Sequence, residues 1–136
     1  QAGRGPAPAG SGVTVALVAL GAALGAPLRY LIDRLVQHRN GSRFPWGTFT
    51  VNVAGSFLLG VLVGGATASA VPHAAVALLG TGLCGALTTY STFGYETLRL
   101  LEQRAGAVAV ANAVASTAGG LGAAGCGFAV ATALWP

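Results

Sequence analysis

Charge is scarce in this chain, and lysine and methionine are absent from it. Only 7% of the 136 residues are charged, whereas about a quarter is usual for a soluble domain. Hydrophobic residues make up 54% of the chain, and the mean hydropathy is +0.70. This shortage of charge excludes an ordinary soluble domain and favours an integral membrane protein.

The side chains that usually catalyse reactions or bind metals are also few. Cys84 and Cys126 lie in apolar stretches, and we expect two buried thiols rather than a disulfide or a metal site. His38 and His73 have no metal-ligand spacing, and no Ser/His/Asp set is visible. We therefore expect that the protein is not an enzyme and has no organic cofactor.

The net charge of +4 comes from arginine alone. Most of the arginines lie at the ends of apolar segments, where membrane orientation and contact with lipid headgroups explain them better than nucleic acid does. We therefore expect membrane lipid as a partner and no nucleic acid. We expect a multi-pass protein of the plasma membrane. For a bacterium this would be the inner membrane.

Apolar stretches divide the chain into four segments that are long enough to cross a membrane. Residues 1–12 are rich in Gly, Pro and Ala and predict a flexible tail, so residues 13–136 form a single transmembrane domain. A polar loop is expected at 33–43. The predicted fold is an all-α integral membrane protein with four transmembrane helices at about 13–28, 46–71, 74–98 and 105–135.

The third segment is expected to be a broken helix. Gly80, Gly82 and Gly85 precede a hydroxyl-rich run at 88–93. Broken helices at membrane depth occur where they are buried in protein or line a watery cavity. Their freed carbonyls can bind a cation, and their freed N–H groups an anion. A glycine-softened helix, with hydroxyls bonded back to its own carbonyls, explains this segment equally well.

Polar residues recur at helical spacing in the other segments. Thr48, Asn52 and Ser56 follow one another at i, i+4 and i+8, so they share one face of the second segment. The same spacing relates Asn112 and Ser116 in the fourth segment. Such stripes line a pathway or join helices by hydrogen bonds. Arg29 ends the first apolar run, where an arginine reaches lipid headgroups or attracts anions to a pore mouth.

No carboxylate lies in the middle of any segment, because Asp33, Glu96 and Glu102 are all near segment ends. Cation channels and proton-coupled pumps usually place a carboxylate inside the membrane. Amide N–H and hydroxyl O–H groups donate to anions instead, and the edge of an aromatic ring carries positive charge density. The polar residues therefore favour a small anion that bonds strongly to hydrogen donors.

Three longer motifs and one short one now point to a family. They are Gly-Ala-Pro-Leu-Arg-Tyr at 25–30, Gly-Thr-Phe-Thr-Val-Asn-Val-Ala-Gly-Ser-Phe-Leu-Leu-Gly at 47–60, Gly-Leu-Cys-Gly-Ala-Leu-Thr-Thr-Tyr-Ser-Thr-Phe at 82–93 followed by Glu96, and Asn112-x-x-x-Ser116. In order and spacing the chain resembles the Fluc/CrcB fluoride channels over all four segments.

The resemblance implies a fluoride-selective channel that exports toxic cytoplasmic fluoride by passive flux, and so implies fluoride resistance. It also implies an antiparallel, dual-topology dimer with two pores. A structural sodium ion at its centre would be held by the backbone carbonyls of Gly85 and Thr88. The residues expected along the fluoride pathway are Arg29, Thr48, Asn52, Ser56, Tyr90, Ser91, Thr92, Phe93, Asn112 and Ser116.

Two features depart from the family pattern. Tyr90 stands where the family usually has Phe. Six arginines also fall on one side of the predicted topology and only Arg4 on the other, which favours one fixed orientation. A homodimer is expected from the resemblance, and a heterodimer with an inverted paralogue from the arginines. The alternatives in function are a small multidrug-type exporter and a non-conducting accessory membrane subunit.

Overall fold

The computed structural model describes residues 10–41, 44–87 and 90–136, with the side chains of 40 and 90–92 outside that description. Every element in the described residues is helical, which confirms the all-α prediction for them. The elements are α1 (Ser11–Asn40), α2 (Trp46–Thr67), α3 (His73–Ala75), the π-helix η1 (Val76–Cys84), α4 (Gly85–Leu87), α5 (Tyr90–Glu102) and α6 (Gly106–Leu134).

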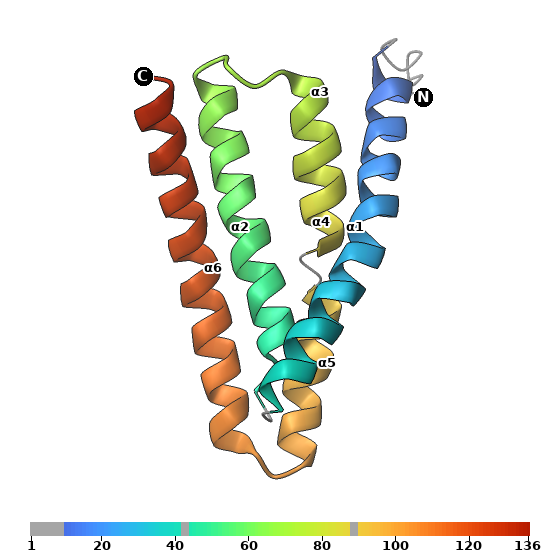
Figure 1. Ribbon diagram of the computed structural model, residues 1–136, viewed down its shortest axis with the longest axis vertical. Coiled ribbons are helices and arrows are strands. Elements are labelled where there is room, and N and C mark those ends of the chain that lie inside the picture. The colour runs from blue at the N-terminus through green and yellow to red at the C-terminus, as the bar shows by residue number, and fades with distance from the viewer. Residues whose placement is uncertain (1–9, 42–43, 88–89) are drawn as a thin grey trace, which may run out of the picture.

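The long helices lie side by side and alternate in direction along the chain (Figure 1). Three of them, α1, α2 and α6, are long and apolar enough to cross a membrane. The start of α1, the C-terminus and the α2–α3 connection lie at one end of the molecule (Figure 1). The last turn of α1 and the α5–α6 turn lie at the other. The arrangement is that of a multi-pass membrane protein.

Helix α1 is longer than the sequence pattern predicts. A polar loop was expected at 33–43, but α1 continues to Asn40, so that prediction is wrong for most of the loop. The helix ends at Gly41, whose φ of 56° is left-handed and whose N–H donates to the carbonyl of Gln37 at 3.2 Å. Glycine adopts this conformation without strain. The true end signal was Gly41 rather than the first charged residue.

The other boundaries are close to expectation. Helix α2 begins at Trp46 as predicted and ends at Thr67, four residues earlier than expected. Helix α6, at Gly106–Leu134, matches the fourth predicted segment. Of the predicted tail, Ser11 and Gly12 belong to α1, and 1–9 lie outside the described residues.

The third segment consists of several short helices in succession. Helix α3 passes into the π-helix η1, which contains Gly80 and Gly82, and then into α4. A π-helix, in which hydrogen bonds join residues five apart, is rare and often occurs at functional sites. Helix α5 begins at Tyr90. Thr88 and Thr89, where the break was expected, lie outside the described residues, so the break itself stays a prediction.

The glycines of α1 allow it to approach η1 very closely. A Cβ atom added to Gly21 would collide with the carbonyl oxygen of Leu78, and one added to Gly25 would lie 2.7 Å from the carbonyl oxygen of Leu83. Any larger residue would force the two backbones apart. Gly21 and Gly25 are four residues apart, a spacing of small residues that suits close helix packing, and they form such a contact within the chain.

A second close contact joins α2 and α6. A Cβ atom added to Gly60 would collide with the carbonyl oxygen of Ala124, and one added to Gly64 would lie 2.6 Å from the Cβ of Ala131. From the other side, Gly127 approaches the carbonyl of Phe57. Both small-residue faces, Gly21/Gly25 and Gly60/Gly64, are therefore packed against helices of the same chain.

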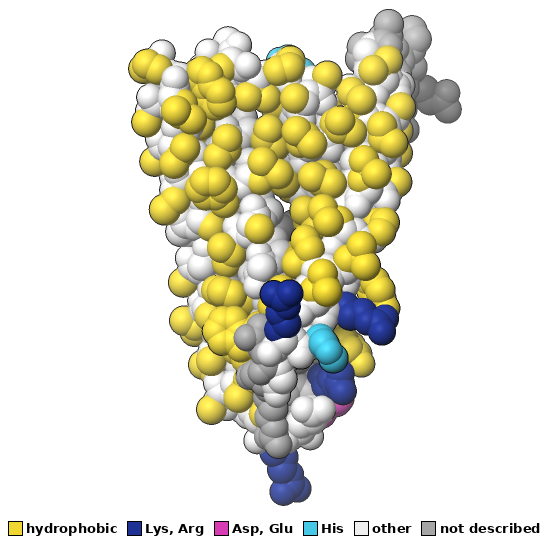
Figure 2. Space-filling model, in the orientation of Figure 1, with side chains coloured by type: hydrophobic (Ala, Val, Ile, Leu, Met, Phe, Trp, Pro, Cys, Tyr) yellow, Lys and Arg dark blue, Asp and Glu magenta, His cyan; other side chains and the backbone are white. Residues whose placement is uncertain are grey.

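Charged and apolar side chains separate along the molecule. Figure 2 shows a broad hydrophobic surface, with arginine side chains gathered toward the end that holds the last turn of α1. The two cysteines also differ. Cys84 is buried in η1, whereas Cys126 is exposed on α6, so the prediction of two buried thiols is wrong for Cys126. The small residues of α6 let it expose this side chain where no helix among the described residues covers it.

Candidate functional site

The polar stripe of α2 faces the interior of the helix assembly. Thr48 is completely buried, and Asn52 and Ser56 are half-buried along the same face. The position for a Cβ on Gly120 lies 3.4 Å from the Oγ of Ser56, so this end of the stripe lies against α6. The stripe predicted from the i, i+4, i+8 spacing is thus at the contact of α2 with its neighbours.

Thr48 joins α2 to α5. Its hydroxyl Oγ1 donates to Oε1 of Glu96 at 2.8 Å. The bond therefore fixes the middle of α5 against the first turn of α2. On the other side of α2, α1 also approaches closely, because a Cβ added to Gly47 would collide with Oδ1 of Asp33.

A second polar link joins α5 to α6. The amide Nδ2 of Asn112 donates to Oγ1 of Thr97 at 3.1 Å, and the Thr97 hydroxyl donates to the carbonyl of Phe93 at 2.8 Å. Ser116 donates to Oδ1 of Asn112 at 3.2 Å. Because both ends of the buried Asn112 amide are bonded, this residue and Ser116 act here as a connection between helices.

Arg29 and Glu96 each keep an unsatisfied polar atom at the same end of the molecule. The Nε and Nη2 atoms of Arg29 and the Oε2 atom of Glu96 are buried and find no hydrogen-bond partner among the described residues. Arg29, Asp33 and Arg99 all lie close enough to Glu96 to interact with its charge. Buried polar groups without a partner cost about 1–3 kcal/mol each. The two guanidinium donors are therefore available to an anion or a water molecule.

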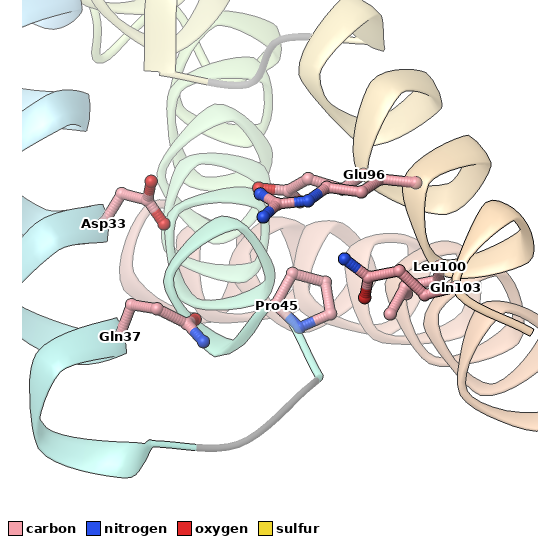
Figure 3. Close-up of a pocket in the computed structure, with 7 residues that line it drawn as sticks. Asp33, Gln37, Pro45, Glu96, Leu100 and Gln103 are labelled. Carbon is pink, nitrogen blue, oxygen red and sulfur yellow. The ribbon is translucent and has the colours of Figure 1, made fainter. Parts of the chain in front are cut away.

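Glu96 and Arg99 border an open pocket of about 350 Å³. Asp33 and Gln37 of α1 face Glu96 of α5 across it, and Pro45 lies between them at the start of α2 (Figure 3). Leu100 and Gln103 complete the far side (Figure 3). The pocket opens at the charged end, and through Glu96 it adjoins Thr48, the first residue of the polar stripe of α2.

The residues predicted for a pathway are brought together only in part. Thr48 contacts α5 through Glu96. Phe93 is half-buried on the same helix, and its carbonyl accepts a hydrogen bond from Thr97. The side chains of Tyr90, Ser91 and Thr92 lie outside the part of the chain that the structure describes. Gly85 is exposed at the start of α4, and a Cβ atom added to it would meet none of the described heavy atoms within 4 Å.

Three residues of the site, Asp33, Glu96 and Thr97, were not predicted from the sequence to have a role in it. Glu96 and Thr97 provide the two links from α5 to its neighbours, and Asp33 faces Glu96 across the pocket. Asp33 and Glu96 were noted as carboxylates near segment ends, and Thr97 was not singled out. The spacing could have indicated the role of Glu96. This residue lies three positions after Phe93, which was predicted for the pathway, and so shares its helix face.

The fold and the site define a multi-pass membrane protein with polar groups buried between its helices. The sequence pattern of the family described as CrcB-like protein, Camphor Resistance (CrcB), matches residues 16–128. The chain belongs to this family.

Three relatives are similar over most of their length. The fluoride-specific ion channel FluC 1 of Streptomyces avermitilis is 62% identical over 88% of this chain and 96% of its own. The protein of that name in Frankia casuarinae is 57% identical over 88% of this chain and 96% of its own. The one in Thermobifida fusca is 49% identical over 86% of this chain and 94% of its own.

Proposed function

We propose that this protein is a subunit of a fluoride-specific channel that lets cytoplasmic fluoride leave the cell passively. The observation that carries the proposal is similarity over nearly the whole chain to proteins named fluoride-specific ion channels. Similarity at 62% identity includes every segment that bears the polar residues, rather than one motif alone.

The geometry supports an anion as the permeating species. Fluoride is small and strongly hydrated, so a pathway must replace its hydrogen bonds to water with donors of its own. Arg29 lies close enough to Glu96 to interact with its charge, and it has two buried N–H groups that find no hydrogen-bond partner among the described residues. Asn52 and Ser56 continue the donor series along α2. Arg29 and Arg99 lie close enough to Glu96 to offset its negative charge, which lowers its repulsion of an anion.

We further propose four spans, of which the third is broken at the hydroxyl run, and an antiparallel homodimer. The helices from His73 to Leu87 and α5 together reach from one end of the molecule to the other (Figure 1), which supports a single interrupted span. The exposed backbone at Gly85 supports a structural sodium ion shared between two subunits. Thr88, the second proposed carbonyl, lies outside the described residues.

Two other functions make different demands. A small multidrug-type exporter exchanges protons for drug through a carboxylate in the membrane, and α1 has no acidic residue before Asp33. An accessory subunit would use the polar links only to join helices, as Asn112 and Ser116 do here. A heterodimer with an inverted paralogue stays as the alternative assembly, because the arginines gather at one end.

Ion efflux from liposomes tests the proposal. Purified protein reconstituted in liposomes loaded with fluoride or chloride should release fluoride rapidly and retain chloride. Equal release of both anions would contradict selectivity. No release of either by a protein that is dimeric and folded would favour the accessory subunit, and proton-coupled uptake of an organic cation would favour the exporter.

Sodium is tested in the same liposomes. Replacement of sodium by a large organic cation, at constant ionic strength, should lower fluoride release and weaken the dimer, because backbone oxygens suit a small monovalent cation. Release and dimer stability that are indifferent to the exchange would exclude the ion without excluding the channel.

A further inference from the structure

Helix α1 is too long for its last third to lie within the bilayer. Its 30 residues span about 45 Å at 1.5 Å per residue, whereas the hydrocarbon core of a bilayer is about 30 Å thick. The apolar run ends near Arg29, where the charged residues begin. Residues 30–40 therefore continue α1 into the headgroup region at the charged end of the molecule.

This projecting part of α1 has a polar inner side and a mixed outer side. On the inner side, the carboxylate of Asp33 lies against Gly47 at the start of α2. The outer side exposes Leu31 and Leu35 at 55% and 61%. They are four residues apart and so share one helix face. Two large apolar side chains exposed among charged residues suit the boundary between headgroups and acyl chains.

Cationic groups lie beside the exposed leucines. The Arg34 guanidinium donates through Nη1 to the hydroxyl of Tyr30 at 2.9 Å, which holds it over this face. His38 follows one turn later. Two adjoining hollows, of about 420 and 470 Å³, share Tyr30, Arg34 and His38 in their walls. The second also includes Leu31 and Leu35, so it combines donors for an anion with an apolar floor.

The carboxylate in this region does not cancel the positive charge of the outer side. Asp33 borders the first of the two hollows but not the second, and its Oδ1 is directed toward Gly47. Arg39 adds a further exposed cation in the last turn of α1. Figure 2 shows arginine and histidine side chains beside hydrophobic ones at this end of the molecule. The outer side is therefore cationic and apolar together.

We propose that the outer side of residues 30–38 binds an anionic phospholipid. The phosphate accepts hydrogen bonds from Arg34 and His38, the Tyr30 ring lies at headgroup depth, and an acyl chain covers Leu31 and Leu35. An arginine near an anionic membrane surface strengthens binding by electrostatic attraction, and tyrosine favours the interface. The site depends on the membrane location of the chain and is independent of which ion it conducts.

Lipid retention tests the site. The intact protein is taken from bilayers that contain equal amounts of phosphatidylglycerol and phosphatidylcholine, and its bound lipids are counted by native mass spectrometry. It should retain phosphatidylglycerol in clear excess. The Arg34→Gln variant should bind phosphatidylglycerol about fivefold less tightly, which corresponds to about 1 kcal/mol for one arginine at the surface.

A matched variant separates a site from general charge. Arg104→Gln removes the same charge from the α5–α6 turn at the same end of the molecule, and it should retain phosphatidylglycerol like the unchanged protein. Tyr30→Phe, which keeps the ring but releases Arg34, should weaken retention by a smaller factor than Arg34→Gln does.

Three results would overturn the proposal. They are equal retention of the two lipids by the unchanged protein, equal losses in the Arg34 and Arg104 variants, and a change of subunit number rather than of bound lipid in Arg34→Gln. The last result would mean that a second copy of the chain covers this side of α1.

Discussion

Individual side chains at the charged end explain how three helices are held together. Thr48 and Glu96 join α2 to α5, and Thr97 and Asn112 join α5 to α6. Hydrogen bonds inside a membrane protein have little competition from water, yet their net contribution is about 1 kcal/mol. The larger effect comes from loss of one partner, because the other is then left buried and unsatisfied.

Thr48→Val should destabilise the protein and reduce fluoride release. Valine has nearly the same shape but removes the donor to Oε1 of Glu96, and Oε2 has no donor among the residues that the structure describes. The expected loss is about 1–3 kcal/mol, measured by thermal unfolding in detergent. Thr50→Val is the matched control, because its hydroxyl bonds only to the carbonyl of Trp46 in its own helix, at 2.7 Å. Equal effects of the two substitutions would contradict a specific role for the Thr48 bond.

Asn52→Asp should abolish fluoride release and leave the dimer intact. A carboxylate only accepts hydrogen bonds and repels an anion, whereas the amide donates. Asn112→Asp offers a contrast, because its amide is bonded at both ends and its replacement should chiefly lower stability. Flux in liposomes and size-exclusion chromatography measure the two effects. Unchanged fluoride release by Asn52→Asp would remove this residue from the ion pathway.

At the scale of helices, periodicity and composition predict much of the structure, and contacts between helices explain the rest. The starts of α2 and α6 follow from Pro45 and from the turn before Gly106. The end of α1 was misplaced, because charged residues continue a helix as readily as they begin a loop and only Gly41 stops it. The partners of the small-residue faces were also beyond prediction, since spacing shows that a close contact exists but not with which helix.

Gly60→Ala should destabilise the contact between α2 and α6. The added methyl group would collide with the backbone carbonyl of Ala124, which cannot move without displacing its helix. Overpacking of this kind costs about 1–3 kcal/mol, which thermal unfolding in detergent would detect. Gly122→Ala is the control, since none of the described atoms lies within 4 Å of its added atom, and it should be neutral. A Gly60→Ala protein as stable as the control would refute the close packing described here.

For the whole molecule, the membrane class follows from composition, whereas the site depends on folding. The stripe on α2 was visible as spacing within one helix. Glu96 joins it only because the chain reverses direction after α2 and brings α5 back beside the start of that helix. A short-range pattern contains no information on such pairings. The gathering of arginines at one end was visible, and it bears on how the molecule is oriented in the membrane.

Orientation can be measured by labelling single cysteines at the two ends of the molecule. Gln103→Cys places a thiol in the exposed α5–α6 turn, and Ala70→Cys places one at the opposite end, in the exposed α2–α3 connection. Both are made in a Cys126→Ser background, while the buried Cys84 is kept. An impermeant thiol reagent is then applied to intact cells and to inverted membranes.

A dual-topology homodimer predicts that each site reacts from both sides in equal fractions, because half of the subunits are inverted. The arginine bias acts against this result, since it favours a cytoplasmic location for the charged end. If Gln103→Cys reacts only in inverted membranes and Ala70→Cys only in intact cells, every copy has the same orientation and the homodimer is excluded. Fluoride release should then require a second, inverted protein, and the purified chain alone should be inactive in liposomes.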